Sequence, residues 1–224
     1  MNVLVFASRK GGSGKSTLAA HLATYIATPE RKTLLIDSDP QGSLSFWHRI
    51  RGEENPALKH NPRDLTQTLK AARSEGYDWV LVDTPPNKSP IVVEAIRNAT
   101  LVIIPTRPSL FDIAAVQDTV AIARELRKPY AAVINGAPAK RGGEEAPIVA
   151  DARGALNALK VPVWAGQITH RADFSMALAE GEGAEEFDPG SYAADELGRL
   201  WTAIDRSIKA VQGAYKGRGT RTAA

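Results

Sequence analysis

Residues 3–17 read VLVFASRKGGSGKST, and this stretch decides the fold of the chain. It passes from an apolar run of strand character into a glycine-rich loop, and then into an alanine- and leucine-rich segment at 16–27 that predicts a helix. Glycines let the backbone of such a loop turn tightly, so that its N–H groups converge on an anion. The helix that follows directs the positive end of its dipole at the same point. The stretch therefore predicts a phosphate-binding loop between a buried strand and a helix.

The loop also carries side chains suited to a nucleoside triphosphate with a bound metal ion. Lys15 offers a mobile cation to the β- and γ-phosphates, and the hydroxyl of Ser16 is a ligand for Mg²⁺. A chance glycine-rich turn is the alternative, but Gly-Lys-Ser between a strand and a helix argues strongly against it. We therefore predict that the chain binds ATP with Mg²⁺ here and hydrolyses it. The predicted nucleotide-binding residues of the loop are Lys10, Gly11, Gly12, Ser13, Gly14, Lys15, Ser16 and Thr17.

Short apolar runs recur along the chain and predict the strands of a parallel sheet. They lack the polar alternation of strands that have one face in solvent. Predicted helices lie between them, notably at 110–127 and 144–159, so we expect an α/β fold with a doubly wound, mainly parallel sheet and helices on both faces. The polar segment 51–62 is expected to be a loop. The predicted strands are residues 3–7, 33–37, 79–83, 101–104, 131–134 and, with a weaker pattern, 161–165.

The composition is that of an ordinary globular protein. The 224 residues include 43% hydrophobic and 24% charged residues, which suits one sizeable domain. We expect that domain at 1–212, followed by a basic, flexible tail at 213–224. Cysteine is absent, which excludes a disulfide framework, cysteine-ligated zinc and an iron–sulfur cluster held by this chain. No signal peptide is expected, since the apolar stretch at 1–7 lacks a basic leader and runs directly into the glycine-rich loop. No integral membrane segment is expected either, since no apolar run approaches about 20 residues.

The net charge of +3 belongs to one end of the chain. Five basic residues and no acidic residue follow Asp205, whereas the preceding part carries 23 basic and 25 acidic residues. This asymmetry favours a polyanionic partner, with a solvated chain end as the equally weighted alternative.

Apolar residues near the end of the chain recur at helical spacing and form one stripe. We expect a helix that packs on the domain through this stripe. A helix lying on a membrane surface is the alternative. Gly213, Gly217 and Gly219 argue against it, because they are expected to end the helix early. The stripe consists of Leu197, Leu200, Trp201, Ile204, Ile208, Val211 and Tyr215.

Four motifs, in order along the chain, resemble those of the ParA/MinD family of ATPases. In the glycine loop, Lys10 precedes the glycine pair and Arg9 stands where the general pattern has glycine, which is similar to the family's deviant Walker A box. DSDPQG at 37–42 resembles its D-x-D-P-Q-G switch, DTPP at 83–86 its Walker B segment, and PTRPSLFD at 105–112 its P-x-x-P-S-x-x-D segment. The resemblance covers residues 2–112, extends loosely to 170–174, and implies a P-loop NTPase fold most like compact, ParF-like members.

The resemblance implies that three residues take part in catalysis. In the family, ATP lies between two subunits: the lysine matching Lys10 reaches the partner's phosphates, and the one matching Lys15 acts within its own subunit. At about 4 Å and an effective dielectric constant near 20, one such contact is worth up to about 4 kcal/mol before desolvation. The carboxylate matching Asp39 is expected to orient the attacking water.

Metal and base contacts are assigned in the same way. Ser16, Asp37 and Asp83 are expected to lie near Mg²⁺, since hydroxyl and carboxylate oxygens are suitable ligands or hold its water ligands. Asn135 follows a predicted strand and is our candidate for contacting adenine.

The family's output is nonspecific DNA binding by an ATP-bound homodimer, which partitions plasmids or chromosomes, or positions another cargo, until hydrolysis resets it. The resemblance thus implies a cytoplasmic, nucleoid-associated ATPase whose slow hydrolysis is stimulated by a ParB-like or other adaptor protein. Two alternatives stay open: a MinD-like membrane-associated positioning ATPase, and a ligase similar to dethiobiotin synthetase. The predicted DNA-contacting residues, each more often an ordinary surface charge when taken singly, are Arg171, Lys209, Lys216, Arg218 and Arg221.

Overall fold

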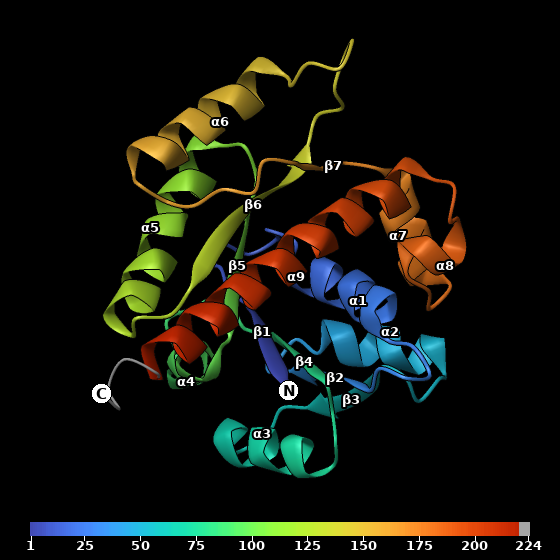
Figure 1. Cartoon of the computed structure of the whole chain (residues 1–224). Coiled ribbons are helices and arrows are strands. Elements are labelled where there is room, and N and C mark those ends of the chain that lie inside the picture. Colours follow the sequence, from blue (N-terminus) through green and yellow to red (C-terminus); the bar gives the residue numbers. More distant parts are fainter. Residues whose placement is uncertain (220–224) are drawn as a thin grey trace.

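A parallel sheet lies at the centre of the structure (Figure 1). The computed structural model describes residues 1–219, with side chains described for residues 1–213. The strands of that part are β1 (Asn2–Phe6), β2 (Thr33–Asp37), β3 (Ala57–His60), β4 (Trp79–Asp83), β5 (Leu101–Thr106), β6 (Tyr130–Ala137) and β7 (Ile168–Thr169). They form one seven-stranded sheet in the order β3-β2-β4-β1-β5-β6-β7, and each neighbouring pair runs parallel.

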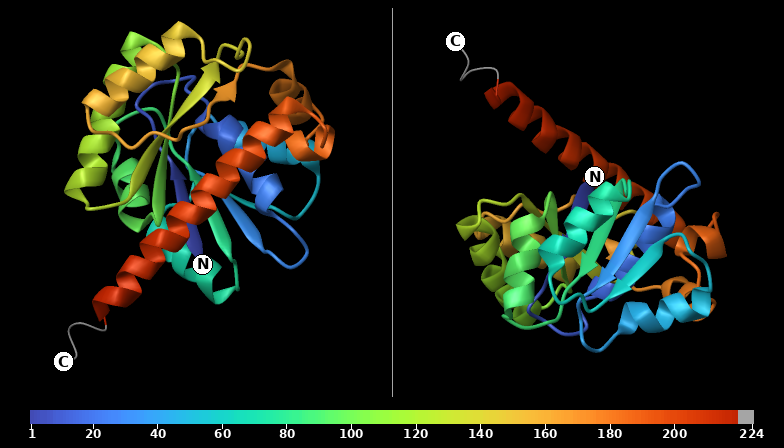
Figure 2. Two further views of the ribbon diagram at one scale, coloured as in Figure 1. Left: turned by 45° about the horizontal axis from the view of Figure 1, so that its top comes forward. Right: turned by 90° about the horizontal axis from the view of Figure 1, so that it is seen from below.

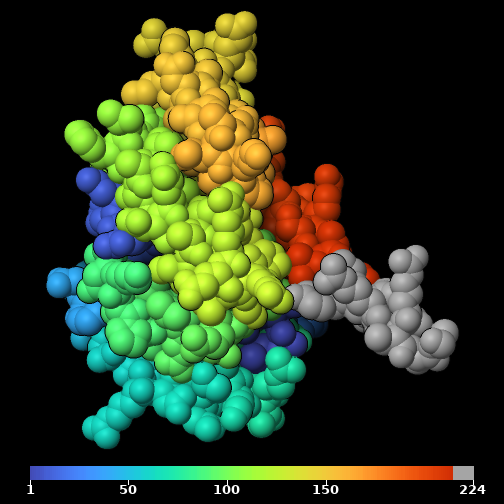
Figure 3. Space-filling view, turned by 90° about the vertical axis from the view of Figure 1, so that its left-hand side faces the viewer, coloured from blue at the N-terminus to red at the C-terminus, as the bar shows by residue number. Residues whose placement is uncertain are grey.

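Helices cover both faces of this sheet, as its apolar strands require. The strands β2 and β4 are buried along their whole length, because side chains on both faces pack against helices. One face carries α3 (Leu65–Ser74), α4 (Pro90–Asn98), α5 (Leu110–Glu125) and α6 (Pro147–Ala158), and Figure 3 looks onto α5 and α6. The other carries α1 (Lys15–Ile26), α2 (Ser43–Arg51), α7 (Ala172–Ala179), α8 (Ala184–Phe187) and α9 (Tyr192–Gly219). The predicted doubly wound fold is confirmed.

Two predictions about strands are wrong, both near the edges of the sheet. The segment predicted as a loop contains β3, a four-residue edge strand whose side chains are half-buried or exposed, so it lacks an apolar run. The predicted strand at 161–165 contributes only an isolated bridge between Ala132 and Val163. Pro162 has no N–H to donate to a ladder, and the edge strand forms instead at Ile168–Thr169.

The last helix is longer than predicted. Its stripe packs on the domain as expected, since Leu197, Leu200, Ile204 and Ile208 are buried. Of the three glycines expected to end the helix early, Gly213 and Gly217 lie within it, because α9 continues to Gly219 and extends past the sheet (Figure 2). Glycine inside a helix costs about 1 kcal/mol, which weakens a helix without ending it. The tail predicted from residue 213 therefore begins inside a helix.

The carboxyl ends of the strands lie at one edge of the sheet and bring polar side chains together there. Register places Asp37 at the end of β2 beside Asp83 at the end of β4, and Asp83 beside Phe6 at the end of β1. The glycine loop follows β1 directly. In open parallel sheets this edge is where ligands bind. None of the helices in this described part of the chain is both long and apolar enough to cross a membrane.

Candidate functional site

The glycine loop adopts backbone conformations that require glycine. Gly12 and Gly14 have φ angles of 70° and 96°, in the left-handed region, and Gly14 caps the start of α1. Asn135, from the end of β6, donates a hydrogen bond from Nδ2 to the carbonyl of Ser13 at 2.7 Å. A Cβ at Gly14 would lie 2.0 Å from that nitrogen, so the close approach also excludes a side chain. Asn135 therefore stabilises the loop through this hydrogen bond. The contact with adenine predicted for it stays a prediction.

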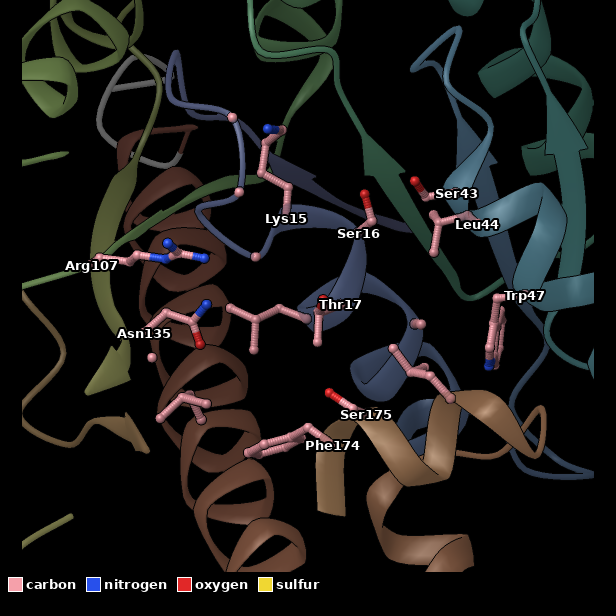
Figure 4. Close-up of a pocket in the computed structure, with 18 of the residues that line it drawn as sticks. Lys15, Ser16, Thr17, Ser43, Leu44, Trp47, Arg107, Asn135, Phe174 and Ser175 are labelled. Carbon is pink, nitrogen blue, oxygen red and sulfur yellow. The ribbon is translucent and has the colours of Figure 1, made fainter. Parts of the chain in front are cut away.

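A cavity of about 780 Å³ opens beside the loop (Figure 4). This volume suits a nucleotide, since ligand cavities commonly measure about 300–1,000 Å³. The predicted site residues among those that line it are Gly11, Gly12, Gly14, Lys15, Ser16, Thr17, Asp39, Asn135 and Arg171. Ser13 belongs to the loop and is buried. Lys10 is exposed, and it is not among the described residues that line the cavity.

Lys15 extends from the start of α1 toward the glycine loop (Figure 4). Its side chain is largely buried, and burial lowers the pKa of the ammonium group, while the nearby carboxylates Asp83 and Asp39 act in the opposite direction. A buried cation with only partial charge compensation favours the arrival of an anion. The residue is thus placed to bind a phosphate group.

Asp83 and Ser16 together fit a magnesium ion held by a nucleotide. Ser16 Oγ donates to Asp83 Oδ2 at 2.5 Å, and Asp83 Oδ1 is buried with no hydrogen-bond partner among the described residues. Burial raises the pKa of Asp83 to about 7, against the opposing effects of the Ser16 hydrogen bond and of Lys15. A buried carboxylate oxygen without a partner, beside a hydroxyl, suits a cation and its water ligands.

The other two carboxylates occupy different positions at the same edge. Asp37 is fully buried, and its Oδ2 accepts hydrogen bonds from the N–H and the hydroxyl of Ser45 at 2.9 and 2.8 Å. Asp39 lines the cavity, and its Oδ1 accepts from the N–H of Gln41 at 3.0 Å. Asp39 therefore borders the cavity in which phosphates would lie. Asp37 does not line the cavity, and its hydrogen bonds to Ser45 hold the turn between β2 and α2.

Several side chains that line the cavity were not predicted from the sequence. Arg107 follows β5, and its Nη2 lies 3.5 Å from where a Cβ on Gly12 would be. Phe174 and Trp47 add aromatic surface from α7 and α2, and Gln41 lines the wall beside Asp39. Arg107 and Phe174 lie within segments that resemble the family, and this resemblance could have identified them as residues of the site. Trp47 carried none, because an aromatic residue on a helix usually indicates core packing.

A model of the CobQ/CobB/MinD/ParA nucleotide binding domain matches residues 4–184. The chain belongs to this family. It is 27% identical to Maintenance of carboxysome distribution protein A of Halothiobacillus neapolitanus, over 90% of this chain and 95% of that protein. It is 31% identical to the chromosome-partitioning ATPase Soj of Thermus thermophilus, over 55% of this chain but only 62% of Soj. The solved ATP complex of a Cyanothece McdA variant has a TM-score of 0.71 at 20% identity, covering 95% of this chain and 96% of that one.

Membership of the ParA/MinD family confirms the resemblance that rested on four motifs. The match begins in β1 and extends to α8, so it includes every wall of the cavity. The roles assigned to Lys10, Asp37 and Asp39 stay predictions, since similarity of sequence and fold tests none of them directly.

Two of the predicted DNA contacts of this ParA/MinD-type domain form ion pairs within the chain. Arg171 bonds Glu196 at 2.8 Å and lies over the ring of Tyr192. Lys209 pairs with Asp205 at 2.6 Å while keeping a largely exposed side chain. Lys216 and Arg218 belong to the last turns of α9, and Arg221 lies outside the described residues.

Proposed function

We propose that this chain is a ParA-type ATPase that positions DNA or another cargo through cycles of ATP-dependent dimerisation. The observation that supports this most is the cavity in which Lys15, Ser16 and Asp39 meet, with Asp83 directly behind them. Two of its relatives are named for chromosome partitioning and for maintenance of carboxysome distribution, and both are positioning functions.

Binding of ATP depends on the loop and the start of α1. Backbone N–H groups and the helix dipole bind the phosphates, and Lys15 neutralises charge on the β- and γ-phosphates. Ser16 and Asp83 would hold Mg²⁺, Asp83 through a water ligand, and the ion would supply positive charge to the same phosphate oxygens. Asp39 orients a water molecule toward the γ-phosphate.

Dimerisation in this proposal uses Lys10, whose side chain is exposed and therefore accessible to a second copy. A second copy facing the loop receives this cation at its own phosphates, so the γ-phosphate stabilises the pair. Loss of that phosphate on hydrolysis weakens the contact and releases the subunits. A ParB-like or other adaptor protein accelerates this step.

DNA retention then depends on how many basic residues the assembly presents. Each neutralised phosphate contributes about −0.9 to the slope of log affinity against log salt. A dimer offers twice the contacts of a monomer and therefore binds far more tightly. The basic C-terminal segment is the proposed surface, because five basic residues follow Asp205.

Retention on random-sequence DNA tests this function. We expect binding only with ATP and Mg²⁺, with an affinity that falls steeply as salt is raised. ADP in place of ATP is the matched control. Equal retention with ADP, or none with ATP at low salt, contradicts the proposal.

One structural observation favours a second candidate, a MinD-like regulator anchored to a membrane surface. Gly213 and Gly217 lie inside α9 and do not end it, and the helix extends beyond the sheet (Figure 2). This removes one objection to a helical anchor, although Leu197, Leu200 and Ile204 of its apolar stripe are already buried against the domain. ATP-dependent binding to vesicles containing anionic lipid, without salt-sensitive DNA retention, supports this second candidate instead.

A further inference from the structure

A chain of hydrogen bonds joins the edge strand β3 to the turn that carries Asp39. His60, the last residue of β3, lies with Nδ1 2.8 Å from the hydroxyl of Ser45. That hydroxyl lies 2.8 Å from Oδ2 of Asp37, and the N–H of Ser45 bonds the same oxygen at 2.9 Å. No motif includes either His60 or Ser45.

The direction of these bonds follows from the chemistry of the groups. An ionised carboxylate only accepts, so the single proton of the Ser45 hydroxyl goes to Asp37. The Ser45 oxygen then accepts from His60, which requires the tautomer with hydrogen on Nδ1. The imidazole is about half exposed, with its side chain 49% accessible, so one edge contacts the turn and the other faces outward.

The bonds close the turn at residues 38–44 from both ends. Asp37 Oδ1 accepts from the N–H of Asp39 at 3.3 Å, and Oδ2 holds the N–H of Ser45. The N–H of Asn61, the residue that follows β3, also bonds the carbonyl of Asp37 at 2.7 Å, so the end of β3 and the residue after it both hold this point. The orientation of the Asp37 carboxylate therefore sets both ends of the segment that presents Asp39 to the cavity.

Such a restraint is needed because like charges crowd this edge of the sheet. Asp37 and Asp39 both act electrostatically on the buried Asp83. A carboxylate that repels its neighbours keeps one orientation only when donors hold it. His60 fixes the hydroxyl of Ser45 in the rotamer that serves this purpose.

We propose that His60 and Ser45 are positioning residues for hydrolysis, which act through Asp37 on the turn that bears Asp39. This inference rests on the ATPase activity proposed above. Neither residue is among those that line the cavity, so they govern how fast bound ATP reacts more than how tightly it binds. The expected effect on the rate of hydrolysis depends on the hydrogen-bond donor at Nδ1 of His60.

Three substitutions of His60 test this assignment, because they differ in where the side chain carries a hydrogen-bond donor. His60→Asn places an amide N–H near the position of Nδ1, whereas His60→Gln places it near Nε2 and His60→Ala removes it. We expect kcat to fall about tenfold in His60→Ala and His60→Gln, with KM for Mg·ATP changed less than about twofold. His60→Asn should keep most of the activity.

Two comparisons exclude a general effect on folding. His48 on α2 bonds the carbonyl of Pro56 at 2.9 Å and lies outside the chain of bonds, so His48→Ala is the matched control and should leave kcat unchanged. In a Ser45→Ala background, His60→Ala should cause no further loss, because both act through one hydrogen bond. Equal losses in His60→Asn and His60→Ala, additive losses in the double variant, or an unchanged kcat in His60→Ala would each overturn the proposal.

Amide hydrogen exchange gives a readout that is independent of catalysis. Residues 38–44 should exchange faster in His60→Ala and His60→Gln than in the wild type and His60→Asn. Unchanged exchange there also overturns the inference. If the wild type fails to hydrolyse ATP, the proposed function fails, while the exchange pattern still decides the role of His60 in holding the turn.

Discussion

Lys15 combines two properties that rarely coexist in a lysine: its side chain is largely buried, and it borders an open cavity. Removing this cation leaves the phosphates without their nearest positive charge. We expect Lys15→Ala to weaken ATP binding about a hundredfold or more, measured by equilibrium dialysis of the monomer. Lys10→Ala is the control, because the exposed Lys10 should leave monomer binding intact. Normal affinity in Lys15→Ala would contradict the assigned phosphate site.

Asp39 faces the same cavity but has a different task. We expect Asp39→Ala to bind ATP nearly as tightly as the wild type while releasing phosphate about a hundredfold more slowly, because it no longer orients water. ATP-bound dimers should then accumulate, as light scattering would show. Asp151→Ala, an exposed carboxylate of α6, is the control. Undiminished phosphate release in Asp39→Ala would refute the role.

Individual site residues differed in how well the sequence predicted them. The loop residues and Asp39 were predicted to line the site because motif spacing fixes their position after a strand. Asn135 was predicted beside the nucleotide, but its bond to the loop was not, since it joins positions 122 residues apart. The chain from His60 to Asp37 was not predicted, because it depends on an edge strand that the sequence pattern hid.

At the scale of elements, His21 joins α1 to α7 and α8. Its Nε2 donates to the carbonyl of Phe174 and its Nδ1 accepts from the N–H of Ala184, both at 3.1 Å, so the ring is neutral. Burial lowers the pKa of His21 to about 4, which outweighs the opposing hydrogen bond to Phe174. The unfolded chain takes up this proton near pH 6.5, so between pH 6.5 and 4 it binds more protons than the folded chain.

The contribution of His21 to stability is therefore complete above pH 6.5 and is lost as the pH falls toward 4. We expect its share of the unfolding free energy to decrease by about 2 kcal/mol between pH 7 and pH 5. Urea denaturation of the wild type and of His21→Asn at both pH values would measure it. The variant should show a flatter pH dependence, and identical slopes would count against the assignment.

Arg51 ties the end of α2 to the segment around α8. Its side chain is only 5% exposed, and it pairs with Glu186 at 2.7 Å and Glu53 at 2.8 Å. We expect Arg51→Met to destabilise the fold by about 2 kcal/mol in urea denaturation, because both carboxylates lose their partner. Arg49→Met on the same helix is the matched control and should change stability by less than about 0.5 kcal/mol. Similar losses in the two variants would mean that the ion pairs contribute little.

Elements were predicted well wherever burial gave a continuous apolar pattern. β2 and β4 match their predicted bounds, and α5 and α6 match theirs within a few residues. The failures have different causes. β3 is an edge strand that is only partly buried, and β7 is buried but only two residues long, so neither has a continuous apolar run. The glycines of α9 are tolerated because packing of its first half holds the helix.

At the scale of the whole molecule, charge is unevenly distributed. Replacing Lys216, Arg218 and Arg221 together by alanine removes six positive charges from a dimer, so the salt slope of DNA binding should flatten by up to about 5. Filter binding across a salt titration measures this. Replacing Lys140, Arg141 and Lys160 instead is the control of equal charge. An unchanged slope in the first variant would show that DNA is contacted elsewhere.

The bond between Gln212 of α9 and Asn2 at the start of β1, 2.7 Å long, brings the last helix back to the first strand. Asn2 begins β1, so this bond lies at the amino edge of the sheet, whereas the glycine loop that borders the cavity follows the carboxyl end of β1. A fluorescent reporter joined to Met1 would hence be carried on the far side from the opening through which nucleotide enters. Microscopy of such a fusion in living cells should follow the molecule without obstructing its turnover.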